Sequence, residues 1–229
     1  MKKIFIKHHL GLGDCIAHNG MVRKVLSDNP NSEVYLSSKS HNYDNMKFMY
    51  RDNQNVKILV LDDQGTNEHL ITNHYDQVIS SHFEGKPNSD YLNIGDDAFY
   101  HKAGFDPKVR KDYFYLERDY VSEKKIYDKI TSEIGSQNYI FIHEKPEDNI
   151  IIDRKKIPNN LPIVYAKKEY NFFDLLTVME KAQEIHLVSS SFLVLFMIKK
   201  FNEKVFAHMY ADRSNLTTMI KYHGIDVIS

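Results

Sequence analysis

Short apolar runs alternate with amphipathic stretches through the first third of this 229-residue chain. The run at 3–7 predicts a strand, and apolar residues at helical spacing over 14–26 predict a helix that Asn29-Pro30-Asn31 ends. Strands that alternate with helices in this way form a parallel sheet. The next predicted elements are a strand at 33–36, a mixed helical segment at 43–50, and strands at 56–61 and 75–80.

The pattern weakens over 81–112, where glycines and prolines interrupt it, so we expect loops over the sheet edge with one short helix at 96–103. A charged helix at 123–134, which Gly135 can end, then leads into a second series of elements. That series comprises strands at 139–143, 163–165, 185–188, 204–208 and 225–228, and helices at 172–182, 191–200 and 213–222.

Two such series in succession predict an α/β fold of two small Rossmann-like domains. The length is sufficient, because domains commonly have about 100 to 200 residues. We expect an N-terminal domain at 1–120 and a C-terminal domain at 121–229. Their parallel sheets would face a cleft, which is a natural place for a ligand.

The charge of the chain is balanced, which bears on its partners. Thirty Lys and Arg side chains against thirty-one Asp and Glu give a formal net charge of −1. Such a chain has no global field to hold nucleic acid, so we expect no nucleic-acid partner. A small basic cluster of Lys108, Arg110 and Lys111, near Tyr113 and Tyr115, is interpreted as a solvated loop face.

Cysteine and histidine content argues against a disulfide or a metal centre. Cys15 is the sole cysteine, which excludes an internal disulfide and a cysteine-rich zinc site. His8, His9 and His18 lie close in sequence but lack the His-x-x-x-His spacing, so we expect no metal. The first apolar run is too short for a signal peptide, and no stretch reaches the roughly 20 apolar residues of a membrane span. We therefore expect an intracellular protein with no integral membrane segment.

The most informative motif is Gly11-Leu12-Gly13-Asp14, a glycine turn between the first predicted strand and helix. Such a turn brings a ligand to the carboxyl edge of a parallel sheet, and Gly11 and Gly13 allow the backbone to approach it closely. Asp14 has two interpretations. It either caps the following helix or acts as a general base that removes a proton from a hydroxyl nucleophile.

A second candidate site follows the strand at 185–188. A helix begins there with Ser189, Ser190 and Ser191. Their hydroxyls and the free backbone N–H groups of the first helical turn predict a site for a phosphate or diphosphate. The alternative is helix capping, which would need only one serine. His143 lies at the end of the strand at 139–143. Lys145 and Arg154 follow it. These cations could neutralise a diphosphate leaving group, and the alternative is a solvated loop.

Common nucleotide-binding motifs are missing. The sequence has no Gly-x-x-x-x-Gly-Lys-Ser/Thr loop, and Ile16 occupies the third glycine position of a Gly-x-Gly-x-x-Gly fingerprint. These absences argue against a kinase, a GTPase or an ordinary dehydrogenase.

In combination, three segments resemble glycosyltransferases of the GT-B fold, most closely the heptosyltransferase-like group and its small bacterial and viral relatives. They are the glycine turn ending in Asp14, the segment 171–176 (NFFDLL) and the segment 182–192 (AQEIHLVSSSF). The resemblance implies that the second domain holds a nucleotide-sugar donor and the first domain holds the acceptor. It also implies that Asp14 is the base, that Ser189 to Phe192 lie against the donor diphosphate, and that no metal or other cofactor is needed.

The resulting hypothesis is a metal-independent, inverting glycosyltransferase with a nucleotide sugar and a glycan or glycolipid acceptor as partners. It would be cytoplasmic, with peripheral membrane contact through the acceptor. Two alternatives stay open at this stage. One is a sugar-nucleotide epimerase or hydrolase, and the other is a nucleotide- or glycan-binding module that has lost turnover.

Overall fold

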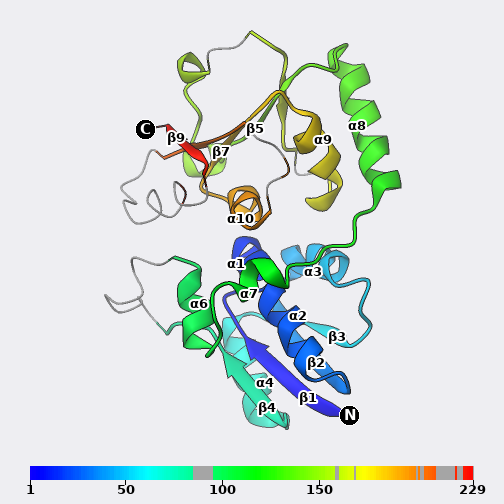
Figure 1. The fold of residues 1–229 in the computed structure, drawn as a ribbon, viewed down its shortest axis with the longest axis vertical. Coiled ribbons are helices and arrows are strands. Elements are labelled where there is room, and N and C mark those ends of the chain that lie inside the picture. Colours follow the sequence, from blue (N-terminus) through cyan, green and yellow to red (C-terminus); the bar gives the residue numbers. More distant parts are fainter. Residues whose placement is uncertain are drawn as a thin grey trace. The chain divides into compact units, whose positions relative to one another are not determined.

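The chain forms two compact units, Met1–Glu117 and Arg118–Ser229, each with its own parallel sheet (Figure 1). The computed structural model describes residues 1–84, 95–157, 160–167, 169–199, 201, 204–209, 220 and 224–228. The predicted α/β class with two parallel sheets is confirmed. The predicted cleft between the sheets stays a prediction.

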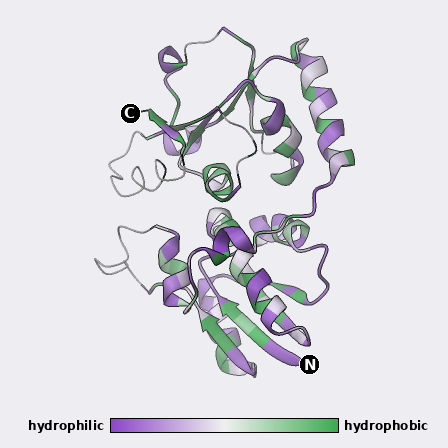
Figure 2. Ribbon diagram, viewed as in Figure 1, coloured by the Kyte–Doolittle hydropathy of each residue, from purple (hydrophilic) through white to green (hydrophobic). Residues whose placement is uncertain are grey.

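The sheet of the first unit contains the four predicted strands in the order β3-β2-β1-β4, all parallel. Their bounds are β1 Lys2–Lys7, β2 Ser32–Ser38, β3 Val56–Val60 and β4 Gln77–Ser80. β1 is central, and its Ile4, Phe5 and Ile6 are fully buried. Its hydrophobic colouring in Figure 2 agrees with a strand that is covered on both faces.

The helices of the first unit differ from the prediction at several points. The single helix expected at 14–26 is two helices that meet at His18, whose ring is hydrogen-bonded on both sides. A helix at 63–72 was not predicted, because only Thr66 within it is buried and its apolar periodicity is weak. The described helices are α1 Leu12–Ala17, α2 Asn19–Asp28, α3 Tyr43–Met49, α4 Asp63–Thr72, α6 Asp97–Lys102 and α7 Val109–Asp112.

The second unit contains the five predicted strands, all parallel, and their order is β6-β5-β7-β8-β9. Their bounds are β5 Ile140–His143, β6 Ile163–Tyr165, β7 Glu184–Val188, β8 Val205–His208 and β9 Asp226–Ile228. Its helices are α8 Tyr120–Ile134, α9 Leu176–Lys181 and α10 Ser191–Ile198. The predicted helix at 213–222 lies outside the described residues except at Ile220.

Local sequence explains where α8 and α10 begin and end. Asp119 caps α8 by accepting a hydrogen bond from the Ser122 N–H, and Gly135 ends the helix with a left-handed φ of 64°. α10 is apolar on nearly every side, and six of its eight residues are buried. It is therefore a core helix, and Figure 2 shows it as predominantly hydrophobic.

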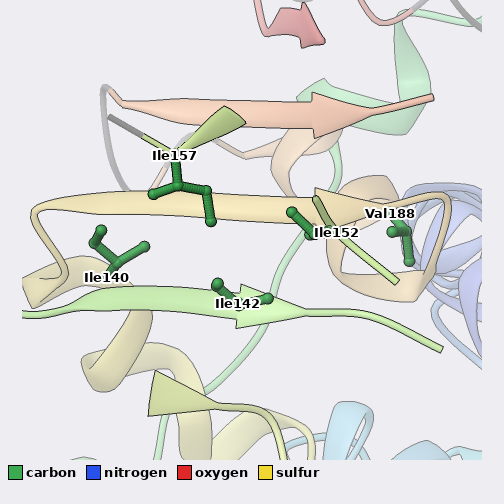
Figure 3. Close-up of a cluster of buried hydrophobic side chains, with 5 residues drawn as sticks. All are labelled: Ile140, Ile142, Ile152, Ile157 and Val188. Atoms are coloured by element: carbon green, nitrogen blue, oxygen red, sulfur yellow. The ribbon is translucent and has the colours of Figure 1, made fainter. Parts of the chain in front are cut away.

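The segment between β5 and β6 packs onto the sheet. Ile152 and Ile157 from this segment cluster with Ile140 of β5 and Val188 of β7, as Figure 3 shows. Ile142 completes the cluster. The apolar residues of this segment are therefore part of the core of the second unit.

A buried ion pair joins α8 to α9. Glu123 has no exposed surface and pairs with the Arg118 guanidinium, which also contacts Glu180. Thr177 donates a hydrogen bond to Glu123 at 2.7 Å. Among the helices of the described ranges, none is both long and apolar enough to cross a membrane.

Candidate functional site

The glycine turn lies at the carboxyl edge of the first sheet, directly after β1. Gly11 is the N-cap of α1, with φ −69° and ψ 144°, and Asp14 is the third residue of that helix. The Asp14 carboxylate accepts a hydrogen bond from the Gly11 N–H, which is the reverse half of a capping box. A Cβ at Gly11 would lie only 2.6 Å from Asp14 Oδ2, so the missing side chain leaves room for the carboxylate. The turn thus fixes where the carboxylate lies.

Three effects set the pKa of Asp14. Burial raises it above the ordinary value, while the Gly11 hydrogen bond and the charge of Lys39 each lower it by less. A raised pKa makes the carboxylate a better proton acceptor near neutral pH. Capping and base catalysis are therefore compatible here, because a single carboxylate can satisfy Gly11 and still accept a proton.

We expect Gly11→Ala to displace the Asp14 carboxylate and so to lower turnover, without unfolding the protein. The backbone at Gly11 suits any residue, but the new Cβ would push the carboxylate aside. Gly65→Ala is the control, because its Cβ would also face a capping carboxylate, that of Asp62 at the N-cap of α4, but at the more tolerable distance of 3.1 Å. Turnover and melting temperature of both variants test this. Equal turnover in the two variants would contradict the positioning role of Gly11.

The charge of Asp14 acts on a second buried carboxylate, Asp96. Burial raises the pKa of Asp96 to about 6, the nearby Arg110 opposes this rise, and the charge of Asp14 adds to it. Arg110 Nη1 lies 3.6 Å from Asp96 Oδ2, and Arg110 Nη2 lies 3.1 Å from Asp97 Oδ1. Arg110 is only 4% exposed. The interpretation of the basic cluster as a solvated face is therefore wrong at Arg110, because two carboxylates draw its guanidinium inward.

Four histidines gather where β1 and β4 end. His8 and His18 are buried with ring centroids 5.2 Å apart, and His9 stacks on His82 at 4.2 Å. His18 Nδ1 donates to the Asp14 carbonyl at 2.6 Å, so Nε2 accepts from Ser81 Oγ at 2.6 Å. In the described ranges, no group of three or more His, Cys, Asp or Glu side chains is arranged to hold a metal ion. These bonds instead attach the glycine turn to the end of β4.

Acid should unfold the first unit through these histidines. Burial lowers the pKa of His8 to about 4 and that of His18 to about 3, from 6.5. A group with a lowered pKa contributes its full stability above pH 6.5 and loses it as the pH falls toward 4. For His8 the loss is about 3 kcal/mol at 1.36 kcal/mol per pKa unit.

Urea unfolding between pH 7.5 and 4.5 measures this loss. We expect His8→Asn to flatten the pH dependence and the exposed His74→Asn to leave it unchanged. A wild-type stability that is constant across this range would contradict the prediction.

A pocket of about 340 Å³ opens at the same carboxyl edge, beyond β2 and β3. Lys39 follows β2, and Leu61 and Asp62 follow β3. The full lining is Lys39, Ser40, His41, Val60, Leu61 and Asp62. This edge of the first unit therefore provides a carboxylate, a cation and a pocket with polar and apolar walls.

The carboxyl edge of the second sheet brings His143 next to α10. The His143 ring lies 4.7 Å from the ring of Phe192, which stacks on Phe172 at 4.3 Å. Burial lowers the pKa of His143 to about 4, so the ring is neutral at physiological pH. Its buried Nδ1 has no hydrogen-bond partner in the described part of the chain. A neutral, unpartnered ring nitrogen at this position can bind a polar ligand group.

The three serines lie where α10 begins. Ser190 is the N-cap in an extended conformation, and its buried Oγ has no partner among the described residues. The first hydrogen bond of the helix joins the Val194 N–H to the Ser190 carbonyl, so the amides of 191–193 have no partner within the helix. Ser191 is the first helical residue, and Ser189 directly precedes the cap. The predicted anion site is thus at a helix N-terminus, where backbone donors favour negative charge.

Arg154 and Lys145 belong to the segment that packs onto the sheet. Arg154 Nη2 lies 3.0 and 2.9 Å from the two oxygens of Glu144, and Nη1 donates to the Ile152 carbonyl at 2.8 Å. Lys145 forms an isolated antiparallel bridge with Ile150. These contacts hold the segment together. The predicted contact of either cation with a diphosphate stays a prediction.

Sequence reasoning did not single out Lys39 or Asp96 as neighbours of Asp14. Lys39 directly follows a predicted strand, so its place at the carboxyl edge could have been inferred. Asp96 lies in the weakly patterned part of the chain, where no signal relates it to Asp14. The charge of Lys39 lowers the pKa of Asp14, and the charge of Asp14 raises the pKa of Asp96.

No protein-family model and no curated protein sequence matches the chain. Solved structures do resemble it. A glycosyl transferase family 9 protein from Veillonella parvula gives a TM-score of 0.56 at 10% identity, over 90% of this chain and 80% of that one. ADP-heptose LPS heptosyltransferase II from E. coli gives a TM-score of 0.50 at 9% identity, over 98% and 100% of the two chains.

The fold of the chain is thus of the GT-B type found in heptosyltransferases, as the sequence resemblance predicted. At identities near 10% the likeness concerns the fold. The activity has to be argued from the residues at the two carboxyl edges.

Proposed function

We propose that this protein is a glycosyltransferase that moves a sugar from a nucleotide-diphosphate donor to a hydroxyl of a glycan or glycolipid acceptor. The main observation is the half-buried Asp14 carboxylate, which Gly11 positions at the carboxyl edge of the first sheet. The GT-B type of the fold supports the choice of reaction, because the similar structures include a family 9 glycosyl transferase and a heptosyltransferase.

In the proposed reaction Asp14 accepts the proton of the acceptor hydroxyl. The oxygen attacks the anomeric carbon from the face opposite the diphosphate, a new glycosidic bond forms, and the bond from that carbon to the diphosphate oxygen breaks. The configuration at the anomeric carbon inverts. The proton stays on Asp14, and the electron pair of the broken bond leaves with the nucleoside diphosphate.

The second unit is proposed to hold the donor. Its diphosphate would lie at the N-terminus of α10, beside Ser189, Ser190 and Ser191 and the amides of 191–193, which have no partner within the helix. Neutral His143 would donate or accept a hydrogen bond there, and Lys145 and Arg154 would supply positive charge. Backbone donors and fixed cations can stabilise a leaving diphosphate in the absence of a metal. The first unit would hold the acceptor beside Asp14.

The donor proposal is tested by nucleotide binding. Only a ligand of the folded state raises the melting temperature, and at 100 times its Kd the gain is about 2.7 kcal/mol, or about 5–10 °C for a chain of this size. We expect such a shift with one of ADP, UDP, GDP or CDP, or with the corresponding nucleotide sugar. ADP is the first candidate, because one similar structure is an ADP-heptose enzyme.

The binding site is located by a charge change at Ser190. Ser190→Asp keeps a good N-cap but places a carboxylate where the diphosphate would lie, so the shift should disappear. Ser132→Asp, on the exposed surface of α8, is the control and should retain the shift. No shift with any nucleotide, or an unchanged shift in Ser190→Asp, would contradict the proposed donor site.

A further inference from the structure

A groove of about 530 Å³ lies along the outer edge of the first sheet, between α3 and the edge strand β3. Its size falls in the usual range of small-ligand sites. It is formed from both elements and from the turn that joins them. The full lining is Tyr35, Tyr43, Lys47, Tyr50, Arg51, Asn53, Gln54, Val56, Lys57, Ile58 and Leu59.

The groove is separate from the site around Asp14. β2 lies between β1, which leads to Asp14, and β3, which forms the groove. Neighbouring strands are about 4.8 Å apart, so β1 and β3 are about 10 Å apart across the sheet. The pocket beyond the carboxyl ends of β2 and β3 shares no residue with the groove.

The charge of the lining has one sign. Three of its residues are cationic, and within the described ranges none of its residues is Asp or Glu. Lys57 Nζ also lies 3.5 Å from Glu33, a residue outside the lining. The protein as a whole has a net charge of −1, so this concentration of positive charge is local. It favours an anionic ligand.

Aromatic rings and amides complete the lining. Lys47 Nζ lies 5.5 Å from the centre of the Tyr43 ring, so charge and ring surface are presented together. Tyr35 and Lys57 are register partners on neighbouring strands. Asn53 and Gln54 add side chains that both donate and accept hydrogen bonds. This set matches a ligand with an apolar face, several hydroxyls and a negative charge.

We propose that the groove binds an anionic saccharide, one whose sugar rings bear carboxylate or phosphate groups. Tyr35 and Tyr43, which are partly exposed, would pack against the sugar rings. The amides would bind hydroxyls, and Lys47, Arg51 and Lys57 would bind the anionic groups. The choice of a saccharide rests on the proposed function, since the groove would then hold acceptor units beyond the reacting hydroxyl. Binding itself requires no donor and no turnover.

Fluorescence anisotropy tests the proposal with two labelled anionic probes, a galacturonic acid hexamer and a mannose pentamer that carries a 6-phosphate. Their uncharged counterparts, a galactose hexamer and unphosphorylated mannopentaose, are the ligand controls. We expect at least one anionic probe to bind at least fivefold more tightly than its counterpart. A thymidine hexanucleotide tests for general affinity toward aromatic polyanions.

Variants test whether the anionic saccharide binds in this groove. Lys47→Glu and Tyr43→Ala should each weaken it at least fivefold. Lys125→Glu makes the same change of net charge on the exposed face of α8 and should leave it unchanged. Asp14→Asn should also bind normally, so a failure of the transfer reaction is distinguishable from a failure of the groove. Absence of binding, an unchanged Kd in Lys47→Glu, or equal binding of the hexanucleotide in this groove would overturn the proposal.

Discussion

Asp14→Asn should reduce sugar transfer by about 10²- to 10⁴-fold, the usual contribution of a general base. The amide is nearly the same size as the carboxylate and can still accept the Gly11 hydrogen bond, so the turn should keep its shape. It cannot take the proton of the acceptor hydroxyl. Nucleotide binding should be unchanged, because the donor is assigned to the second unit.

The rate of transfer at saturating donor, with and without the substitution, measures this effect. Asp44→Asn is the matched control, because Asp44 is an exposed carboxylate in the first turn of another helix, α3. In the wild type the rate should fall as acid protonates Asp14, at a higher pH than for an ordinary Asp, because burial raises its pKa. Near wild-type transfer by Asp14→Asn would exclude Asp14 as the base.

Arg118→Met should cost about 3–5 kcal/mol of stability, the usual result of removing one partner from a buried ion pair. Glu123 has no exposed surface, and its carboxylate would lose the guanidinium that compensates its burial. The Thr177 hydrogen bond would remain and could not replace a charge. Urea unfolding, followed by a signal from the second unit, measures the loss.

Two further variants test whether the uncompensated charge of Glu123 causes the loss of stability. Lys124→Met breaks an exposed pair with Asp128 on the same helix and should change stability little. Arg118→Met combined with Glu123→Gln removes both charges and should recover part of the loss. A double variant less stable than Arg118→Met alone would contradict the account of an uncompensated buried charge.

Much of the fold follows from local sequence pattern. All nine described strands coincide with predicted strands. The inner strands β1 and β5 gave the clearest signal, because a strand that is buried on both faces of a parallel sheet needs a run of nonpolar residues. Helices with weak amphipathic periodicity were harder to predict. α4 buries only Thr66, and His18, where α1 and α2 meet, is hydrogen-bonded to Ser81, 63 residues away. Periodicity cannot report such a distant partner.

The candidate site, like the fold, has parts that the sequence reveals and parts that it does not. Gly11 and Asp14 are recognisable because the turn and its carboxylate are contiguous in sequence. Asp96, whose pKa the charges of Asp14 and Arg110 shift in opposite directions, lies over 80 residues from Asp14 in the chain, so only the folded unit reveals this link. Arg154 shows the opposite case. The sequence suggests a cation for a phosphate, and the structure adds a pairing with Glu144 that no spacing rule indicated.

The central claim is transfer of a sugar from a nucleotide sugar to a hydroxyl acceptor. ³¹P NMR of each nucleotide sugar, recorded with the wild-type protein in the presence and absence of a mixture of glycan acceptors, tests it most directly. We predict that one donor is converted to its nucleoside diphosphate only when acceptor is present, and that Asp14→Asn stops this conversion. Conversion at the same rate without acceptor would indicate a hydrolase, and no conversion of any donor would contradict the account.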